Sequence, residues 1–331
     1  MSSIDVVVPC YRYGRYLREC VQSVLSQGVS ACRILIIDDE SPDDTPQVAQ
    51  ALASEDSRVT YRRHTVNCGH IATYNEGIAW CESDYMLLLS ADDYLLPGAL
   101  QRAMRLLDEH PTMGLCFGEA IEVEDGGARR QININVDFQN AASIVLSGSD
   151  FIHLCAKERA RNIVPTPTAL VRTALLKQIG GYHTDLPHSA DMELWLRLAA
   201  HAPVGILKAD QAAYRRHAAN MSSNYFQDNR ITDLQQRKAA FDIFLEGSGR
   251  HLPDARVLYE SLMKALALEA VAAASMAFND GRQALSEKIC KLAEQLDPRV
   301  RKSTQWRLLS CKKLIGIQVT NALRPIVAKL R

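Results

Sequence analysis

Short apolar runs typical of buried β-strands alternate with helical patterns through the first half of the chain. In the helical segments apolar residues recur at spacings of three and four, and a further helix is expected over 70–81. Strand–helix units of this length predict a mostly parallel sheet with helices on both faces, and ligands of such sheets bind beyond the carboxyl ends of the strands. The strand patterns are Ile4–Val8, Cys32–Ile37, Val59–Arg62 and Tyr85–Leu89.

The pattern changes twice in the rest of the chain. Residues 114–136 are strand-like, whereas 137–165 have no clear pattern. An organised block from Pro165 to His217 includes a helix that begins near Asp191. Long helical patterns dominate after residue 228, so we predict a boundary there between an α/β domain and a helical region.

Charge is balanced overall but segregated along the chain. Lys plus Arg equals Asp plus Glu at 38 each, so the whole chain has no net positive charge to attract nucleic acid. From Pro298 to the end there are nine Lys or Arg and no acid, which gives the tail a charge of +9 and leaves −9 on residues 1–297. The tail therefore needs an explanation of its own.

An apolar stripe at helical spacing runs through this basic tail, and Pro325 should interrupt it. A basic amphipathic helix over 302–331 suits the surface of an anionic membrane. The same stripe equally suits packing on the rest of the chain or on a second subunit, and the sequence leaves these alternatives open. The stripe consists of Leu308, Cys311, Ile315, Val319, Ala322, Ile326 and Leu330.

Cysteine usage and the N-terminus both indicate the cytoplasm. The nine cysteines include no CxxC pair, which favours free thiols in a reducing compartment over disulfides or a zinc site. The N-terminus runs directly into an apolar strand pattern without the basic and apolar regions of a signal peptide. No stretch reaches the length of about 18 consecutive apolar residues that a membrane span needs.

Acidic residues gather where strand patterns end. Asp38 and Asp39 follow the second strand, Asp92 and Asp93 follow the fourth, and Asp191 opens a later helix. Aspartate is common in turns and helix caps, and that explanation would serve for any one of them alone. Together they suggest a chemical site in which one carboxylate contacts a nucleotide, another holds Mg²⁺ or Mn²⁺ on its phosphates, and a third acts as a base.

The motifs resemble those of the family 2 glycosyltransferases, which are inverting enzymes with the GT-A fold. The resemblance covers roughly residues 4–220, with the motifs in the family's order and spacing. It implies a Rossmann-like, mostly parallel central sheet flanked by helices, followed by a C-terminal helical extension. The motifs are Ile4–Tyr11, Leu17–Gln27, Ile36–Ser41, Gly69–Asn75 and Ser90–Asp93.

The resemblance also implies a division of the chain and a donor. The GT-A domain would occupy 1–228, with a nucleotide-sugar half over about 1–112 and an acceptor half over about 113–228. Residues 229–331 would form the helical region with its basic tail. The cofactors implied are a divalent cation, Mn²⁺ or Mg²⁺, and a nucleoside-diphosphate sugar as the donor substrate.

Site roles follow from the resemblance position by position. The nucleobase pocket would involve Pro9, Tyr11, Asp38 and Asp39. Asp93 would be the direct metal ligand and Asp92 the contact to ribose or donor sugar. His217 lies in a segment that approaches the diphosphate and the metal in relatives, although a structural histidine is an equal alternative. The catalytic base would be Asp191.

Some positions depart from the family pattern. Many relatives have an acid where this chain has Ser90, an Arg where it has Tyr74, and a Glu where it has Ala190. The alternative base, Glu193, lies two residues beyond Asp191 and would point to another side of the helix.

The leading hypothesis is a metal-dependent inverting glycosyltransferase that builds a bacterial-type surface polysaccharide or glycolipid. It would work in the cytoplasm or peripherally at the inner face of the cell membrane. Its partners would be a nucleotide sugar and a saccharide or lipid-linked saccharide acceptor, with no nucleic acid, and a homo-oligomer is compatible with the sequence. The alternative is a catalytically silent sugar-nucleotide-binding or scaffold subunit of a glycan-assembly complex.

Overall fold

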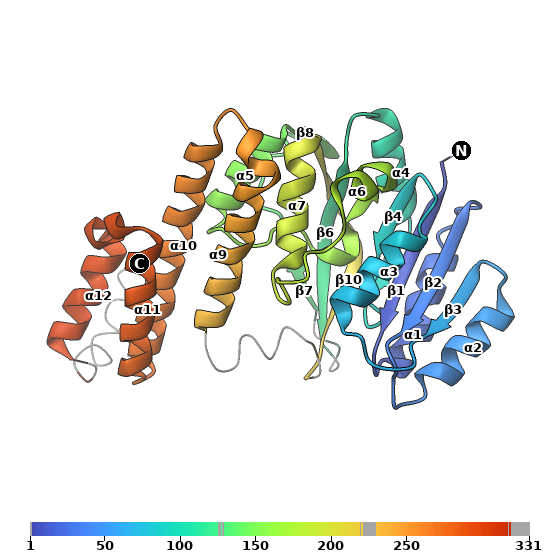
Figure 1. Cartoon of the computed structure of the whole chain (residues 1–331), viewed down its shortest axis with the longest axis horizontal. Helices are drawn as coiled ribbons and strands as arrows, with labels where there is room; N and C mark the ends of the chain where they lie inside the picture. Colours follow the sequence, from blue (N-terminus) through green and yellow to red (C-terminus); the bar gives the residue numbers. More distant parts are fainter. Residues whose placement is uncertain are drawn as a thin grey trace.

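A central ten-stranded sheet with helices on both faces organises the protein, as the computed structural model shows (Figure 1). The model describes residues 2–124, 127, 129–218, 220, 230–316 and 318. The strands are β1 Ile4–Cys10, β2 Cys32–Asp38, β3 Val59–Arg63, β4 Tyr85–Leu88, β5 Tyr94–Leu95, β6 Leu115–Glu124, β7 Arg129–Ile132, β8 Ser143–Leu146, β9 Leu170–Arg172 and β10 Val204–Arg216. The α-helices are α1 Gly14–Leu25, α2 Thr45–Glu55, α3 His70–Trp80, α4 Ala99–Glu109, α5 Gly148–Lys157, α6 Thr173–Ile179, α7 Ala190–His201, α9 Arg230–Glu246, α10 Ala255–Asn279, α11 Gln283–Leu296 and α12 Thr304–Ile315, with 3-10 turns at Thr166–Thr168, Ser248–His251 and Pro298–Lys302.

Parallel pairing of β1 with β2 and β4, and of β2 with β3, confirms the α/β fold class expected from the alternating patterns. The strand order is β3-β2-β1-β4-β9-β6-β10-β5, with β7 added to β6 and β8 to β10. The short β9 runs antiparallel between β4 and β6. Because β1, β2 and β4 are parallel, the acidic segments that follow β2 and β4 lie beyond the carboxyl ends of the strands, on the same side of the sheet.

Alternate residues of β1 enter different halves of the core. Val6 and Val8 belong to the apolar cluster on the side of α1, α2 and α4. Val7 belongs to the cluster on the side of α3, which also contains side chains of α5 and α7. Since successive side chains of a strand point to opposite faces, a continuous apolar run is what a strand covered on both faces requires.

Sequence patterns did not reveal the full length of β10 or the elements within residues 137–165. Strand β10 runs from Val204 to Arg216, and its register with β6 shifts between Leu207 and Asp210 and again before Ala212. A bulge of this kind breaks the two-residue alternation. The stretch 137–165, which has no clear pattern, contains the four-residue β8 and the helix α5.

Helices α9 to α12 form the end of the molecule away from β3 (Figure 1). Their side chains do not make a separate core: Phe241 of α9 and Leu266 of α10 lie in the same apolar cluster as Phe151 of α5. Among the described helices α10 alone is long and apolar enough to span a membrane by composition, but 61% of its most apolar window is buried inside the protein. A helix in the core of a globular domain shows the same length, composition and burial.

The structure describes only part of the apolar stripe in the tail. Leu308, Cys311 and Ile315 lie on α12 and are exposed, whereas Leu309 beside them is buried. The described part of the stripe therefore does not pack on the chain itself. The remaining stripe positions, from Val319 to Leu330, and Pro325 lie outside the described residues.

Close packing of α3 on β1 should make Gly77 sensitive to substitution. A Cβ at Gly77 would lie 2.3 Å from Val7 Cγ1, so Gly77→Ala should lower the free energy of unfolding by about 1–3 kcal/mol. Helix propensity alone would favour alanine by up to about 1 kcal/mol. Urea unfolding measures the difference, with exposed Ala72→Ser on the same helix as the control. A Gly77→Ala protein as stable as the wild type would contradict this packing.

Candidate functional site

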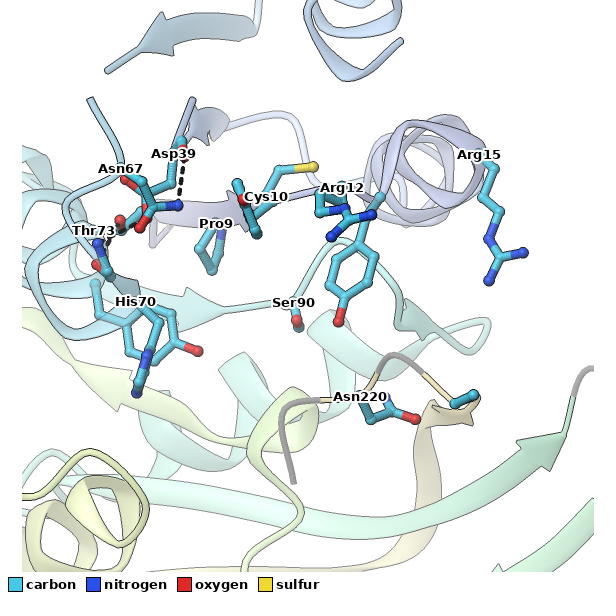
Figure 2. Close-up of a pocket in the computed structure, with 15 residues that line it drawn as sticks. Pro9, Cys10, Arg12, Arg15, Asp39, Asn67, His70, Thr73, Ser90 and Asn220 are labelled. Atoms are coloured by element: carbon cyan, nitrogen blue, oxygen red, sulfur yellow. Dashed lines mark hydrogen bonds between the residues drawn. The ribbon is translucent and has the colours of Figure 1, made fainter. Parts of the chain in front are cut away.

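A cavity of about 610 Å³ lies beyond the carboxyl end of β1, between the starts of α1 and α3. The predicted nucleotide residues Pro9, Tyr11 and Asp39 all line it. Figure 2 shows Asp39 on one side of the cavity and Arg12 and Arg15 on the side of α1. The cavity thus has an acidic end and a basic end, which suits a ligand with a neutral ring system and an anionic group.

Hydrogen bonds to both carboxylate oxygens hold Asp39 in place. Oδ1 lies 2.7 Å from His64 Nδ1 and accepts from the backbone N–H of Cys68 at 2.7 Å, while Oδ2 accepts from that of Gly69 at 2.9 Å. His64 Nε2 lies 2.7 Å from Glu76 Oε2. Burial lowers the pKa of His64, but its hydrogen bonds to the two carboxylates outweigh this, so the net shift is upward.

Asp38 has different surroundings from Asp39. Its side chain is fully buried, accepts from the backbone N–H of Ser41 at 2.8 Å and lies 3.3 Å from Arg63 Nε. It also accepts from the Tyr61 hydroxyl at 3.2 Å, and burial followed by the charge of Asp38 raises the pKa of Tyr61 to about 12. Among the described residues Asp38 is not part of the cavity wall, so the structure shows it holding the turn that presents Asp39.

A second cavity of about 440 Å³ adjoins the first and contains Asp93, a predicted metal ligand, and Asp92, the predicted contact to ribose or donor sugar. Asp92 and Asp93, on the turn after β4, line it and are 5% and 3% exposed. Asp93 Oδ1 accepts from the backbone N–H of Arg215 at 2.8 Å. Burial, followed by repulsion from Asp92, raises the pKa of Asp93 well above its usual range. Two such carboxylates are stabilised by a cation between or beside them.

His217 reaches this pair through Asp92. Its Nε2 lies 3.1 Å from Asp92 Oδ2, and its ring stacks on Tyr16 with centroids 5.3 Å apart. Asn220 Nδ2 donates to the same Asp92 oxygen at 3.1 Å. The structure therefore brings His217 to the acidic pair as a partner of Asp92, and adds Asn220, which sequence reasoning missed.

The donor set at the acidic pair fits a hard divalent cation. Asp92 and Asp93 supply the carboxylate oxygens that Mg²⁺ and Mn²⁺ prefer, and burial followed by repulsion from Asp92 is what raises the pKa of Asp93. A second group that could hold a metal consists of Asp39, His64 and Cys68, whose ligand atoms lie within 4.8 Å of one another. Its thiol makes it a softer site, so the acidic pair matches the expected cations better.

Asp191 lines the second cavity from the start of α7. Oδ1 accepts from the backbone N–H of Met192 at 2.7 Å, and Oδ2 accepts from Asn162 Nδ2 at 2.7 Å and from Thr166 Oγ1 at 3.2 Å. The N-cap residue of the helix is Ser189, so Asp191 does not serve as the cap. Burial raises the pKa of Asp191 despite these hydrogen bonds, which suits a group that takes up a proton.

Glu193, the alternative base, is occupied elsewhere. Its carboxylate is buried and forms an ion pair with Arg197 at 2.8 Å. Arg197 also donates to the backbone carbonyls of Gly180 and Gly181 at 2.7 and 2.6 Å. The pair therefore anchors the loop before α7, and among the described residues Glu193 does not line the cavity with Asp191.

Several residues of the two cavities were not predicted. Arg12 and Arg15 follow the first strand, and Arg12 has a left-handed backbone with φ of 64°. Their cationic side chains next to the predicted Tyr11 were a usable signal that the sequence analysis did not use. Two further arginines at the end of β10 do not line the first cavity. Arg215 and Arg216 form ion pairs with Glu19 and Glu122 at 2.6 Å each.

Sequence comparisons match this chain to a family profile and to bacterial proteins. The sequence profile described as Glycosyl transferase family 2 matches residues 5–180. An uncharacterised protein of Mycobacterium tuberculosis is 26% identical over 71% of this chain and 73% of its own length. The uncharacterised glycosyltransferase YibD of Escherichia coli is 22% identical over 82% of this chain and 78% of its own.

Solved structures with the same fold include TarS and a mannosyltransferase. TarS of S. aureus, residues 1–349 in complex with UDP, aligns with a TM-score of 0.55 at 16% identity and covers 91% of each chain. The mannosyltransferase PcManGT of Pyrobaculum calidifontis, in complex with GDP-Man and Mn²⁺, aligns with a TM-score of 0.54 at 18% identity over 97% of this chain and 87% of its own. At these identities the likeness establishes the fold.

The bonds of His64 to Asp39 and Glu76 should make stability depend on pH. Because the folded-state pKa of His64 is raised, its contribution is fully present below the unfolded value of about 6.5 and is lost as the pH rises through the folded value. His64→Gln should cost about 1–3 kcal/mol at pH 6 and less at pH 9. Urea unfolding at both pH values measures this, and an equal cost at the two would contradict the charged pairing.

Proposed function

The chain belongs to glycosyl transferase family 2, and on that basis we propose that it moves a sugar from a nucleoside-diphosphate sugar to an acceptor hydroxyl, with inversion at the anomeric carbon. The observation that carries the proposal is that Asp92, Asp93 and Asp191 line one cavity. That cavity adjoins a larger one whose wall contains Asp39 and Arg12. The acids for cation binding and for proton uptake are therefore next to a nucleotide-sized cleft.

The first cavity would bind the nucleotide. Pro9 and Tyr11 would cover the base, and Asp39, held by His64 and two backbone N–H groups, would present a fixed acceptor to it. Arg12 would meet the negative diphosphate at the other end. The bound ligands of related folds support a nucleotide of this class, since TarS holds UDP or UDP-GlcNAc and PcManGT holds GDP-Man.

Departure of the nucleoside diphosphate is mainly an electrostatic problem, because negative charge builds on its oxygens as the anomeric bond breaks. Asp92 and Asp93 would hold Mn²⁺ or Mg²⁺, which supplies Lewis-acid neutralisation of that charge. His217 and Asn220 fix Asp92 by hydrogen bonds to its Oδ2, and the Arg215 backbone fixes Asp93. These bonds keep both carboxylates oriented before the donor arrives.

Attack by the acceptor needs a base, because a sugar hydroxyl is a weak nucleophile at neutral pH. Asp191 would take the proton of that hydroxyl while Asn162 and Thr166 hold the carboxylate through Oδ2. Its raised pKa brings its basicity closer to working pH than that of an exposed aspartate. A single displacement with one base inverts the anomeric configuration, so no covalent sugar–enzyme intermediate should form.

Two substitutions separate donor binding from chemistry. Asp93→Asn should weaken Mn²⁺-dependent binding of the nucleotide sugar by at least tenfold, because the variant loses a charged ligand. Asp191→Asn should bind the donor within about twofold of wild type yet lower transfer by 10²–10⁴-fold, the range for a lost general base. Calorimetry with Mn²⁺ and a panel of nucleotide sugars measures binding, and release of nucleoside diphosphate measures turnover.

Asp185→Asn is the matched control, because Asp185 is an exposed acid six positions before Asp191, with a side chain that is 82% exposed. It should leave binding and turnover unchanged. Transfer that persists in Asp191→Asn would exclude Asp191 as the base. A wild type that binds a nucleotide sugar but transfers to no acceptor or water would favour the alternative of a silent binding subunit.

We also propose a role in surface polysaccharide or glycolipid synthesis, with peripheral contact at the inner face of the cell membrane through the tail. Three apolar side chains of α12 support the contact: Leu308, Leu314 and Ile315 are 54%, 86% and 47% exposed. The nine tail cations would add attraction to anionic lipid. Apolar side chains next to cations are the composition of an interfacial helix.

Vesicle sedimentation tests the membrane contact. The wild type should sediment with phosphatidylglycerol vesicles, and Leu314→Glu should reduce the bound fraction several-fold because a charge replaces the most exposed apolar side chain of α12. Val257→Glu, at another exposed apolar position, is the control and should bind like the wild type. Wild-type protein that stays in the supernatant would reject the contact.

A further inference from the structure

A third cavity also has the proposed base in its wall. It has a volume of about 410 Å³, and Thr166, Asp191 and Tyr214 line both it and the cavity that contains the acidic pair. Asn162, which donates to Asp191 Oδ2, belongs to the wall of the third cavity only. The base is thus reachable from two directions, one with the cation-binding acids and one without them.

The wall of the third cavity combines apolar side chains, among them Ile132 and Ile163, with side chains that recognise hydroxyl groups. Asn133 and Asn135 carry amides that can both donate and accept, and Tyr214 adds a ring. The Asn162 amide is held by Asp191 Oδ2 and by the backbone N–H of Val164. Asn135 Nδ2 donates to Glu158 Oε1 at 2.8 Å, which places an amide and a carboxylate side by side. An amide and a carboxylate placed side by side can bind two neighbouring hydroxyl groups of one sugar.

Charge distinguishes the third cavity from the first. The first cavity has two arginines, Arg12 and Arg15, for one acid, Asp39. The third cavity has two acids and two arginines, so its formal charges cancel. Its arginines are also engaged, because Arg161 pairs with the buried Glu269 and Arg216 with Glu122. The third cavity therefore offers no excess positive charge to a phosphate or a carboxylate.

Helices beyond the family match hold one wall of this cavity. Glu269 of α10, 4% exposed, binds Arg161 in the loop that follows α5. Arg237 of α9 donates to the carbonyl of Ala160 in the same loop at 3.2 Å and pairs with Asp233 at 2.9 Å. Because this loop contains Asn162, helices α9 and α10 position the amide that contacts Asp191.

We propose that the third cavity is the acceptor site and that the acceptor is the uncharged, hydroxyl-rich end of a saccharide. The inference rests on the proposed function, since it needs Asp191 as the base. An acceptor hydroxyl in the third cavity would reach Asp191 from the side opposite the acidic pair. The donor and acceptor would then meet only at the shared wall of Thr166, Asp191 and Tyr214.

Transfer kinetics of the full chain test the inference. The donor is the nucleotide sugar that binds in the calorimetric panel. The probes are neutral p-nitrophenyl glycosides, with p-nitrophenyl glucuronide as the acidic counterpart. Asn135→Ala should raise the acceptor KM about tenfold, the loss expected for a hydrogen-bonded contact, and Asn133→Trp should block transfer by filling the cavity. Both variants should keep donor KM and donor hydrolysis by water within about twofold.

Gln50→Ala, an exposed amide on α2, is the control and should change neither KM. Transfer to a neutral glycoside with an unchanged acceptor KM in both cavity variants would overturn the location of the site. Glucuronide used as well as neutral glycosides, or donor hydrolysis with no glycoside accepted, would overturn the substrate class. No turnover of any nucleotide sugar, even to water, would instead remove the proposed function on which the inference rests.

Discussion

Two carboxyl groups are buried side by side at the end of β4, and the rest of the site is arranged around them. Asp92 and Asp93 would repel one another in a low-dielectric cavity without partners. Their partners come from 122 to 128 positions away, where Arg215, His217 and Asn220 close the end of β10. The candidate site therefore depends on the pairing of β10 with the rest of the sheet, because that pairing places the partners of the acidic pair.

Asp191 lies where two cavities of different charge meet. Asp191 lines the cavity of the acidic pair, which adjoins the cavity with the two arginines, and it also lines a cavity whose formal charges cancel. The proposed reaction needs such a separation, because its leaving group is an anion and its nucleophile is neutral. Asn162 and Thr166 hold the proposed base at the border between the two cavities.

Sequence patterns predicted the first half of the fold well, because β1, β2 and β4 are covered on both faces and therefore read as continuous apolar runs. The acids Asp39, Asp92 and Asp93 were predictable for a related reason, since each follows the abrupt end of such a run. The C-terminal part of β10 was not, because its register shifts disrupt the alternation that reveals a strand. Asp38 shows the limit of this reasoning, since adjacent residues on a strand end point to opposite sides and only Asp39 lines the cavity.

The sequence by itself determined the class of fold and the order of the acidic segments along the chain, because these depend on local periodicity and on residue types at strand ends. It indicated the family through the resemblance of its motifs. Only the tertiary structure decided which carboxylates share a cavity, that Glu193 is engaged by Arg197, and that α9 and α10 hold the loop of Asn162. The physical reason is that each of these contacts joins a side chain to a partner that only packing brings near. Periodicity along the chain predicts the direction of a side chain from its own element but not the partner that it meets.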